Sequence, residues 1–142
     1  MIYIEEAPFA QMVAHAEATY PNECCGAMLG SVDAAGNKRV KVALLLDNVS
    51  AGSQAARYEL RPQDLLRADR EARAQQLDVI GIYHSHPDCG AYFSETDLKN
   101  SCSWYSFVVL SIVQGRFDHA HSWLPNEEQT AAQKEDLEWP QS

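Results

Sequence analysis

The chain is short of positive charge. Its 142 residues include 11 Lys and Arg against 20 Asp and Glu, which gives a formal net charge of −9. Nucleic-acid binding depends on clustered Lys and Arg that displace counterions from the phosphate backbone. The acidic balance therefore argues against a nucleic-acid partner and favours a protein or a small molecule.

Long apolar runs are also absent. The longest, VALLL and FVVLSIV, fall far short of the ~20 residues that span a bilayer. Residues 1–20 contain no basic leader and carry Glu5 and Glu6 where a signal peptide would be apolar. We therefore expect no membrane association and a soluble, cytoplasmic protein.

Cysteine is sparse, and no two cysteines have the spacing of a zinc ribbon. Cys24 and Cys25 are adjacent, while Cys89 and Cys102 stand alone. Adjacent side chains point to opposite faces of a strand, so Cys24 and Cys25 are poorly placed to bridge each other. Without a secretory signal, we expect reduced thiols.

Nothing in the sequence divides the chain. It has no internal repeat, no low-complexity tract and no long linker rich in Pro, Gly and Ser. Its length falls in the usual range of one domain, and its content of 46% apolar and 22% charged residues is ordinary for a folded protein. One globular unit is expected.

Local patterns predict a mixture of helices and strands. Helices are expected over residues 8–20 and 62–76, the second with Pro at its first position, and Ser94 can cap a short helix over residues 95–101. Residues 48–56 are expected to form a flexible loop, and residues 126–142 a loose or weakly helical tail. Strands are expected at residues 1–4, 24–30, 38–48, 57–60, 78–85, 105–113 and 117–124. This order lacks a simple βαβ alternation and favours an α/β or α+β sheet with helices packed on it.

One stretch, GIYHSHPDCGAYFSETD, carries a metal-binding pattern. His84 and His86 are two residues apart on a predicted strand, so both imidazoles project to the same face. Asp97 follows eleven residues later, after a loop, and can fold back as a third ligand. Two nitrogens and one oxygen, with a fourth position left for water, are typical of a catalytic rather than a structural zinc.

Hydrolysis of a peptide-type bond also needs a proton carrier and a donor for the developing negative charge. Glu23, in PNECCG, lies where a predicted helix has ended and a buried strand begins. A carboxylate at the edge of an apolar strand is costly unless it has a use. Ser94, three residues before Asp97, can supply the hydroxyl donor.

These residues together resemble a known motif. The order Glu23, then HSHP at residues 84–87, then Ser94-x-x-Asp97, is similar to the JAMM motif of the MPN-domain metalloproteases. The segments PNECCGAMLG, VIGIYHSHP and YSFVVLSIV also resemble short bacterial members of that family. The resemblance covers most of residues 2–124 and implies a domain over residues 1–125, followed by an acidic C-terminal tail over residues 126–142.

The resemblance implies a fold, an activity and a set of roles. The fold would be a mixed sheet wrapped around helices, similar to cytidine deaminases. His84, His86 and Asp97 would bind one zinc ion per chain, Glu23 would act as general base and acid, and Ser94 would stabilise the oxyanion. The activity would be hydrolysis of peptide or isopeptide bonds after the C-terminal Gly-Gly of ubiquitin-like proteins. Short bacterial relatives point to a ubiquitin-like sulfur-carrier protein as the partner, and a homodimer is one open alternative for the oligomeric state.

The chain departs from the family pattern at two points. The family commonly has Pro immediately before the motif serine, where this chain has Phe93, and the preceding loop contains Cys89 and Gly90. The motif alone therefore does not secure a rigid loop. As a hypothesis, Cys89 reaches the zinc and occupies the water position, which would produce an inhibited, redox-sensitive form.

Other interpretations are weaker. His119 and His121 repeat the two-residue spacing, but no Ser-x-x-Asp follows them, so they are expected to be surface or packing residues. The start of the metallo-β-lactamase motif HxHxDH also matches, but its last histidine is Cys89 here. Zinc deaminases need a Pro-Cys-x-x-Cys pair that the chain lacks. The remaining alternative is a catalytically silent MPN scaffold that binds a ubiquitin-like partner, and the complete set of ligands weighs against it.

Overall fold

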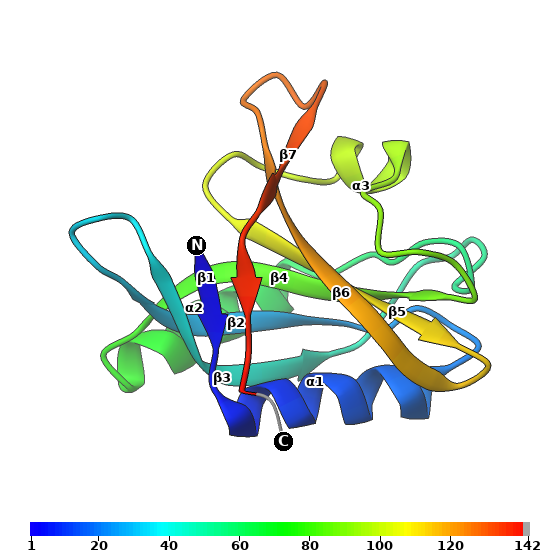
Figure 1. Ribbon diagram of the computed structural model, residues 1–142, viewed down its shortest axis with the longest axis horizontal. Coiled ribbons are helices and arrows are strands. Elements are labelled where there is room, and N and C mark those ends of the chain that lie inside the picture. The colour runs from blue at the N-terminus through cyan, green and yellow to red at the C-terminus, as the bar shows by residue number, and fades with distance from the viewer. Residues whose placement is uncertain (141–142) are drawn as a thin grey trace.

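The computed structural model describes residues 1–140 and contains one mixed sheet with three helices (Figure 1). The strands are β1 (Ile2–Ile4), β2 (Cys25–Val32), β3 (Lys38–Leu46), β4 (Asp78–Pro87), β5 (Ser106–Val113), β6 (Arg116–Pro125), β7 (Ala132–Glu135) and β8 (Leu137–Glu138). The helices are α1 (Glu6–Thr19), α2 (Pro62–Ala74) and α3 (Glu95–Lys99). The strand order is β7-β6-β5-β4-β2-β3-β1-β8, with parallel pairs β4–β5, β1–β3 and β1–β8. The expected mixed sheet with packed helices is confirmed.

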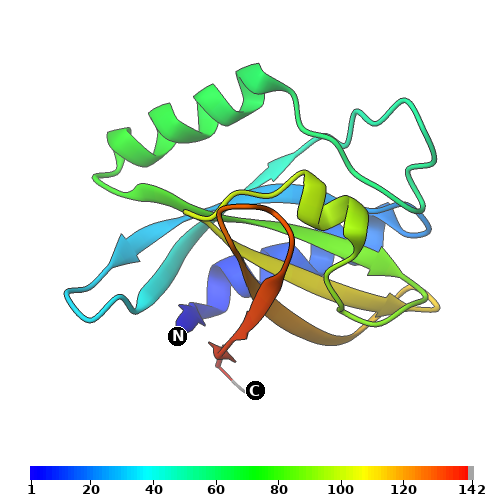
Figure 2. The same cartoon turned by 90° about the horizontal axis from the view of Figure 1, so that it is seen from above.

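The central strands are buried on both faces because a helix covers each face (Figure 2). Met28 of β2 packs in one cluster with Met12 and Ala16 of α1. Its neighbour Ala27 points the other way, into the cluster that contains Ala68 of α2. This alternation explains why β2 reads as a continuous small and apolar run rather than an alternating one.

The pairing of β2 with β4 brings distant parts of the chain together. The two strands are antiparallel, and Cys25 at the start of β2 lies opposite His84 near the end of β4. Residues just before β2 therefore adjoin the end of β4. On its other side β4 pairs in parallel with β5, so the end of β4 has neighbours on both sides.

The C-terminal segment belongs to the sheet. β7 pairs with β6 at one end of the strand order, and β8 pairs with β1 at the other, with Asp136 between them. The backbone N–H of Ile2 donates to the carbonyl of Asp136 at 2.8 Å. Trp139 then stacks on Phe9 of α1, with ring centroids 4.7 Å apart. The prediction of a loose or weakly helical tail is therefore wrong for these residues, and residues 141–142 lie outside the described part.

Two further details differ from the predictions. Residues 57–60, expected to be a strand, are irregular, although Tyr58 within them is buried. Their backbone is held by the side chain of Asn48 and by the backbone N–H of Val49, which donates to the carbonyl of Glu59, rather than by a neighbouring strand. Helix α1 begins at Glu6, two residues before the expected start, because Pro8 fits the first turn of a helix. No helix within residues 1–140 has the length and apolar character needed to cross a bilayer.

Candidate active site

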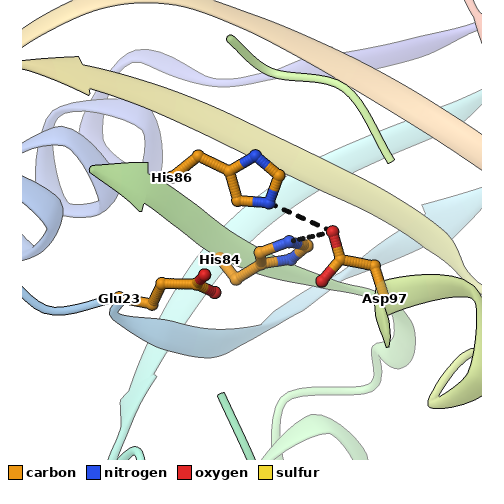
Figure 3. A group of neighbouring side chains, drawn as sticks. All are labelled: Glu23, His84, His86 and Asp97. Carbon is orange, nitrogen blue, oxygen red and sulfur yellow. Dashed lines mark hydrogen bonds and ion pairs between the residues drawn. The ribbon is translucent and has the colours of Figure 1, made fainter. Parts of the chain in front are cut away.

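Four side chains predicted from the sequence converge beside the end of β4 (Figure 3). Glu23 comes from the segment before β2, His84 and His86 from β4, and Asp97 from the first turn of α3. Each offers one nitrogen or oxygen atom, and these atoms all lie within 4.8 Å of one another. All four residues are buried. The structure thus brings together the three predicted metal ligands and the predicted general base.

Helix α3 holds Asp97 through a capping box. The hydroxyl oxygen of Ser94 accepts a hydrogen bond from the backbone N–H of Asp97 at 3.0 Å. In return, Oδ2 of Asp97 accepts one from the backbone N–H of Ser94 at 3.1 Å. The predicted N-cap role of Ser94 is confirmed. Because the cap uses Oδ2 of Asp97, it also fixes the orientation of the carboxylate toward the histidines.

The distances in the cluster suit a shared cation. Nε2 of His84 and Nε2 of His86 each lie 3.1 Å from Oδ2 of Asp97. Ligands about 2.1 Å from a tetrahedral zinc would be separated by roughly 3.4 Å, which is close to this spacing. The contact of His84 lacks hydrogen-bond alignment, and among the described residues Oε1 of Glu23 and both ring nitrogens of His84 have no hydrogen-bond partner. Buried polar atoms are seldom left unpaired, so the residues fit a divalent metal ion.

The hydrogen bond made by Nδ1 of His86 determines the tautomer of this imidazole. Nδ1 of His86 lies 2.9 Å from the carbonyl oxygen of Gly90, which can only accept a hydrogen bond. Nδ1 therefore carries the proton and donates it to Gly90. In the neutral imidazole Nε2 then keeps its lone pair and points it toward Asp97, as a metal ligand must.

The loop that contains Gly90 is tightly held even though Phe93 replaces the family's proline. The backbone N–H of Asp88 donates to Ile112 at 2.7 Å, and the hydroxyl of Ser111 donates to the carbonyl of Cys89 at 2.6 Å. On β6, Nε2 of His119 accepts a hydrogen bond from the backbone N–H of Ala91 at 3.2 Å. Contacts to β5 and β6 therefore supply the order that the motif alone does not secure.

The outer residues of this loop lie at the rim of the cluster. Tyr92 is exposed, and its ring centroid is 5.0 Å from that of His86. Burial raises the pKa of the half-buried Cys89 thiol, and a hydrogen bond with Tyr92 opposes this rise. Cys89 is not part of the group of four, and neither are His119 and His121. A regulatory contact between Cys89 and the metal remains a hypothesis.

Burial and charge set unusual protonation equilibria in the cluster. Burial raises the pKa of Glu23 to about 8, while the His86 imidazole opposes this rise. Burial alone would also raise the pKa of Asp97, but the two imidazoles outweigh it and hold that pKa well below its usual range. The metal-free cluster thus contains one carboxylate that stays ionised and one that exchanges a proton near neutral pH. Such a division is typical of acid–base chemistry.

Two residues that support the site were not predicted. The hydroxyl oxygen of Ser85 accepts a hydrogen bond from the backbone N–H of Cys24 at 2.8 Å, which fixes the segment next to Glu23 against β4. Tyr58, 6% exposed, stacks on His84 with ring centroids 4.5 Å apart. The only sequence signal for Ser85 was its position between the two histidines, and Tyr58 had none.

Comparison with known proteins now identifies the family. Residues 5–130 match the family described as prokaryotic homologs of the JAB domain. The chain belongs to this family. A desampylase from Haloferax volcanii is 33% identical over 107 residues, which cover 75% of this chain and 73% of the relative. A CysO-cysteine peptidase from Mycobacterium tuberculosis is 33% identical over 111 residues, which cover 78% and 70%.

The fold agrees with this assignment. A JAB1/MPN domain protein from Archaeoglobus fulgidus superposes with a TM-score of 0.62 at 16% identity, over 98% of this chain and 99% of that one. The predicted JAB/MPN fold is therefore confirmed. The named relatives also confirm the prediction of a JAMM-type hydrolase, and the buried cluster of this JAB domain could hold a metal ion.

Proposed function

We propose that this JAB domain is a zinc-dependent peptidase or isopeptidase that hydrolyses the amide bond after the C-terminal Gly-Gly of a ubiquitin-like sulfur-carrier protein. The substrate would be a conjugate or an extended precursor. The observation that carries this proposal is the buried group of Glu23, His84, His86 and Asp97, in which Oε1 of Glu23 has no hydrogen-bond partner within residues 1–140. The names of two relatives, desampylase and CysO-cysteine peptidase, support the class of substrate.

The donor set supports zinc as the metal. His84, His86 and Asp97 would hold the ion through two nitrogens and one carboxylate oxygen, which leaves one position open. When bound, zinc supplies a Lewis acid that polarises a carbonyl group and lowers the pKa of a water molecule to about 7. The hydrogen bond from Nδ1 of His86 to Gly90 would keep that imidazole oriented throughout.

Glu23 would move the proton. Its carboxylate lies beside the three ligands, and in the described part of the chain no donor forms a hydrogen bond with its Oε1. It would accept a proton from the attacking water and pass it to the leaving amine. In the metal-free site burial raises the pKa of Glu23 to about 8. The positive charge of a bound zinc ion would lower this pKa and favour the ionised carboxylate that accepts the proton.

Ser94 would stabilise the negative charge on the carbonyl oxygen. Its hydroxyl oxygen accepts the hydrogen bond from Asp97, so its hydroxyl hydrogen is still available to donate. A donor aimed at the developing oxyanion is worth about 10²–10³ in turnover. Capping α3 and stabilising the oxyanion are therefore compatible roles for the same side chain.

The test uses sulfur-carrier proteins whose C-terminal Gly-Gly is followed by one further residue. In one set the terminal glycine forms an amide bond with the α-amine of cysteine, and in another it forms an isopeptide bond with the ε-amine of lysine. The matched control carries Gly-Ala in place of Gly-Gly. Intact-mass spectrometry after incubation with the zinc-loaded protein should show release directly after Gly-Gly and no release from Gly-Ala. Failure to cleave any extended carrier at full zinc occupancy would reject the proposal.

A further inference from the structure

The segment between β3 and α2 is organised around the side chain of Asn48. Nδ2 of Asn48 donates to the carbonyl oxygens of Glu23 and Arg57, at 3.1 and 3.0 Å. Oδ1 of Asn48 accepts from the backbone N–H groups of Ser50 and Glu59, each at 3.1 Å. The amide therefore uses both of its donors and both acceptor positions of its oxygen. Four hydrogen bonds therefore fix the position of the Asn48 side chain.

The same loop also holds the other backbone group of Glu23. The N–H of Glu23 donates to the carbonyl of Gln54 at 2.7 Å. The side chain of Gln54 in turn donates to the carbonyls of Asn48 and Ser50, at 3.1 and 3.2 Å. Both the N–H and the C=O of Glu23 are thus held by this loop, which we call the Asn48 loop (residues 47–60).

Among the described strands, none pairs with the backbone of Glu23. The β2 ladder begins at Cys25, two residues later, so the main chain of Glu23 lies outside the regular sheet. Its side chain is nevertheless buried and directed into the cluster of His84, His86 and Asp97 (Figure 3). A misplacement of about 1 Å in a catalytic group can cost on the order of 100-fold in rate. The placement of Glu23 therefore depends on the loop.

We propose that Asn48 is a positioning residue, which holds the backbone of Glu23 so that its carboxylate faces the reacting bond. This inference rests on the proposed role of Glu23 as general base and goes beyond it, because it gives a function to a residue outside the JAMM motif. Asn48 would act on turnover through Glu23, without contact with the substrate or the metal.

The loop has a second role that the test must separate. Tyr58, next to Glu59, stacks on His84, so a disordered loop could also weaken metal binding. That loss would appear as reduced zinc content. A defect in positioning Glu23 would leave zinc and the Michaelis constant largely unchanged and lower kcat. Zinc stoichiometry and a separation of kcat from KM therefore distinguish the two effects.

The central variants are Asn48→Ala and Asn48→Asp. The first removes all four hydrogen bonds, and the second is similar in shape but replaces the two donors to carbonyl oxygens with acceptors. Each should lower kcat by about 10- to 100-fold on the carrier protein with cysteine in amide linkage after Gly-Gly. KM should change less than about 3-fold, since the variants leave the substrate contacts in place.

Asp33→Ala is the matched control. Oδ1 of Asp33 accepts two backbone hydrogen bonds, from Ala35 and Asn37, in the turn that follows the other end of β2. This substitution also removes side-chain contacts that organise a loop, and it should leave kcat unchanged. Urea denaturation gives the free energy of unfolding of both variants. If Asn48→Ala loses far more kcat than Asp33→Ala for a similar loss of unfolding free energy, its effect on Glu23 is local and does not come from general destabilisation.

A double-mutant cycle provides the decisive readout. If Asn48 acts through Glu23, Asn48→Ala should change the residual rate of the Glu23→Gln protein less than about 2-fold. An equal loss in both backgrounds would mean a merely structural role and would overturn the inference, as would an unaltered kcat for Asn48→Ala. If instead Glu23→Gln itself leaves kcat unchanged, the assignment of Glu23 as the base is wrong.

A milder variant covers the case in which the Asn48 variants do not fold. Gln54→Ala removes the two side-chain hydrogen bonds that brace the loop but keeps the carbonyl that accepts from the N–H of Glu23. It should lower kcat several-fold with zinc retained, and again without effect in the Glu23→Gln background. A full kcat in folded Gln54→Ala, with the Asn48 variants unfolded, would count against the inference.

Discussion

Ser85 of β4 and Cys24, the residue directly before β2, are joined by two hydrogen bonds. The hydroxyl oxygen of Ser85 accepts from the N–H of Cys24 at 2.8 Å, and the N–H of Ser85 donates to the carbonyl of Cys24 at 3.2 Å. Ser85 lies between the two histidines, and Cys24 directly follows Glu23. This junction therefore connects the predicted base to the predicted ligands through a single buried serine.

Ser85→Ala should lower both stability and turnover. It leaves the buried N–H of Cys24 without its side-chain acceptor, which costs on the order of 1–3 kcal/mol of unfolding free energy. We expect kcat to fall about 10-fold while zinc content stays the same. Ser122→Ala is the matched control, because Ser122 is another buried serine, on β6, whose hydroxyl donates to Glu135 of β7 at 2.9 Å. Equal kcat values in the two variants would show that the junction does not position Glu23.

Replacing Glu23 and Asp97 by their amides should separate proton transfer from metal binding. Glu23→Gln removes only the proton carrier, so it should retain about one zinc per chain while kcat falls by on the order of 10²–10⁴. Asp97→Asn removes the ionised ligand that the two histidines share and should lose zinc. Metal analysis after gel filtration, together with the cleavage assay, measures both effects. Loss of zinc from Glu23→Gln would mean that Glu23 is itself a ligand.

The buried carboxyl of Glu23 should make the metal-free protein less stable at high pH. Burial raises its pKa from 4.5 to about 8 in the folded state, whereas the unfolded chain keeps the ordinary value. Between these pH values the folded state holds a proton that the unfolded chain has released. The resulting stability is fully present below about pH 4.5 and is lost as the pH rises through about 8.

Urea unfolding of the chelator-treated protein at about pH 5 and about pH 9 tests this. The free energy of unfolding should fall by a few kcal/mol more in the wild type than in Glu23→Gln. The pKa of His86 is lowered by burial but raised more strongly by its hydrogen bonds to Asp97 and Gly90. It contributes in the same direction in both proteins, and the charge of Glu23 adds to this rise only in the wild type, so the difference reports Glu23 together with its coupling to His86. Parallel pH profiles would contradict a raised pKa at this position.

The candidate site could be predicted because its geometry is mostly local. Alternation along a strand places His84 and His86 on one face, and the capping box fixes Asp97 relative to Ser94 within three residues. The approach of Glu23 and the order of the loop that leads to Asp97 need distant contacts, and the resemblance to the JAMM motif supplied the grouping of these residues. The remaining support could not be predicted, because Asn48 and Ser85 act through hydrogen bonds to residues 25 and 61 positions away in the sequence.

The C-terminal strands were missed for a related reason. The segment AQKE of β7 is mostly polar and has no alternation that would indicate a strand. It forms because β6 offers an edge to pair with, and because buried Glu135 accepts hydrogen bonds from Ser106 and Ser122, at 2.7 and 2.9 Å. Such a strand is determined by its neighbours in the folded sheet, so the local sequence alone does not predict it.

Trp139 anchors this C-terminal segment, and its removal should destabilise the domain. It stacks on Phe9, and it meets Phe117 edge-on with ring centroids 6.1 Å apart, so it joins α1 to β6. Trp139→Ala should lower the unfolding free energy by roughly 1–3 kcal/mol, since a partly buried aromatic ring loses contacts on two sides. Trp104→Ala is the matched control, because Trp104 is 73% exposed, and it should change stability by less than about 0.5 kcal/mol. Urea denaturation of the three proteins checks the difference. Equal stabilities of the wild type and Trp139→Ala would mean that the Trp139 ring does not anchor this segment.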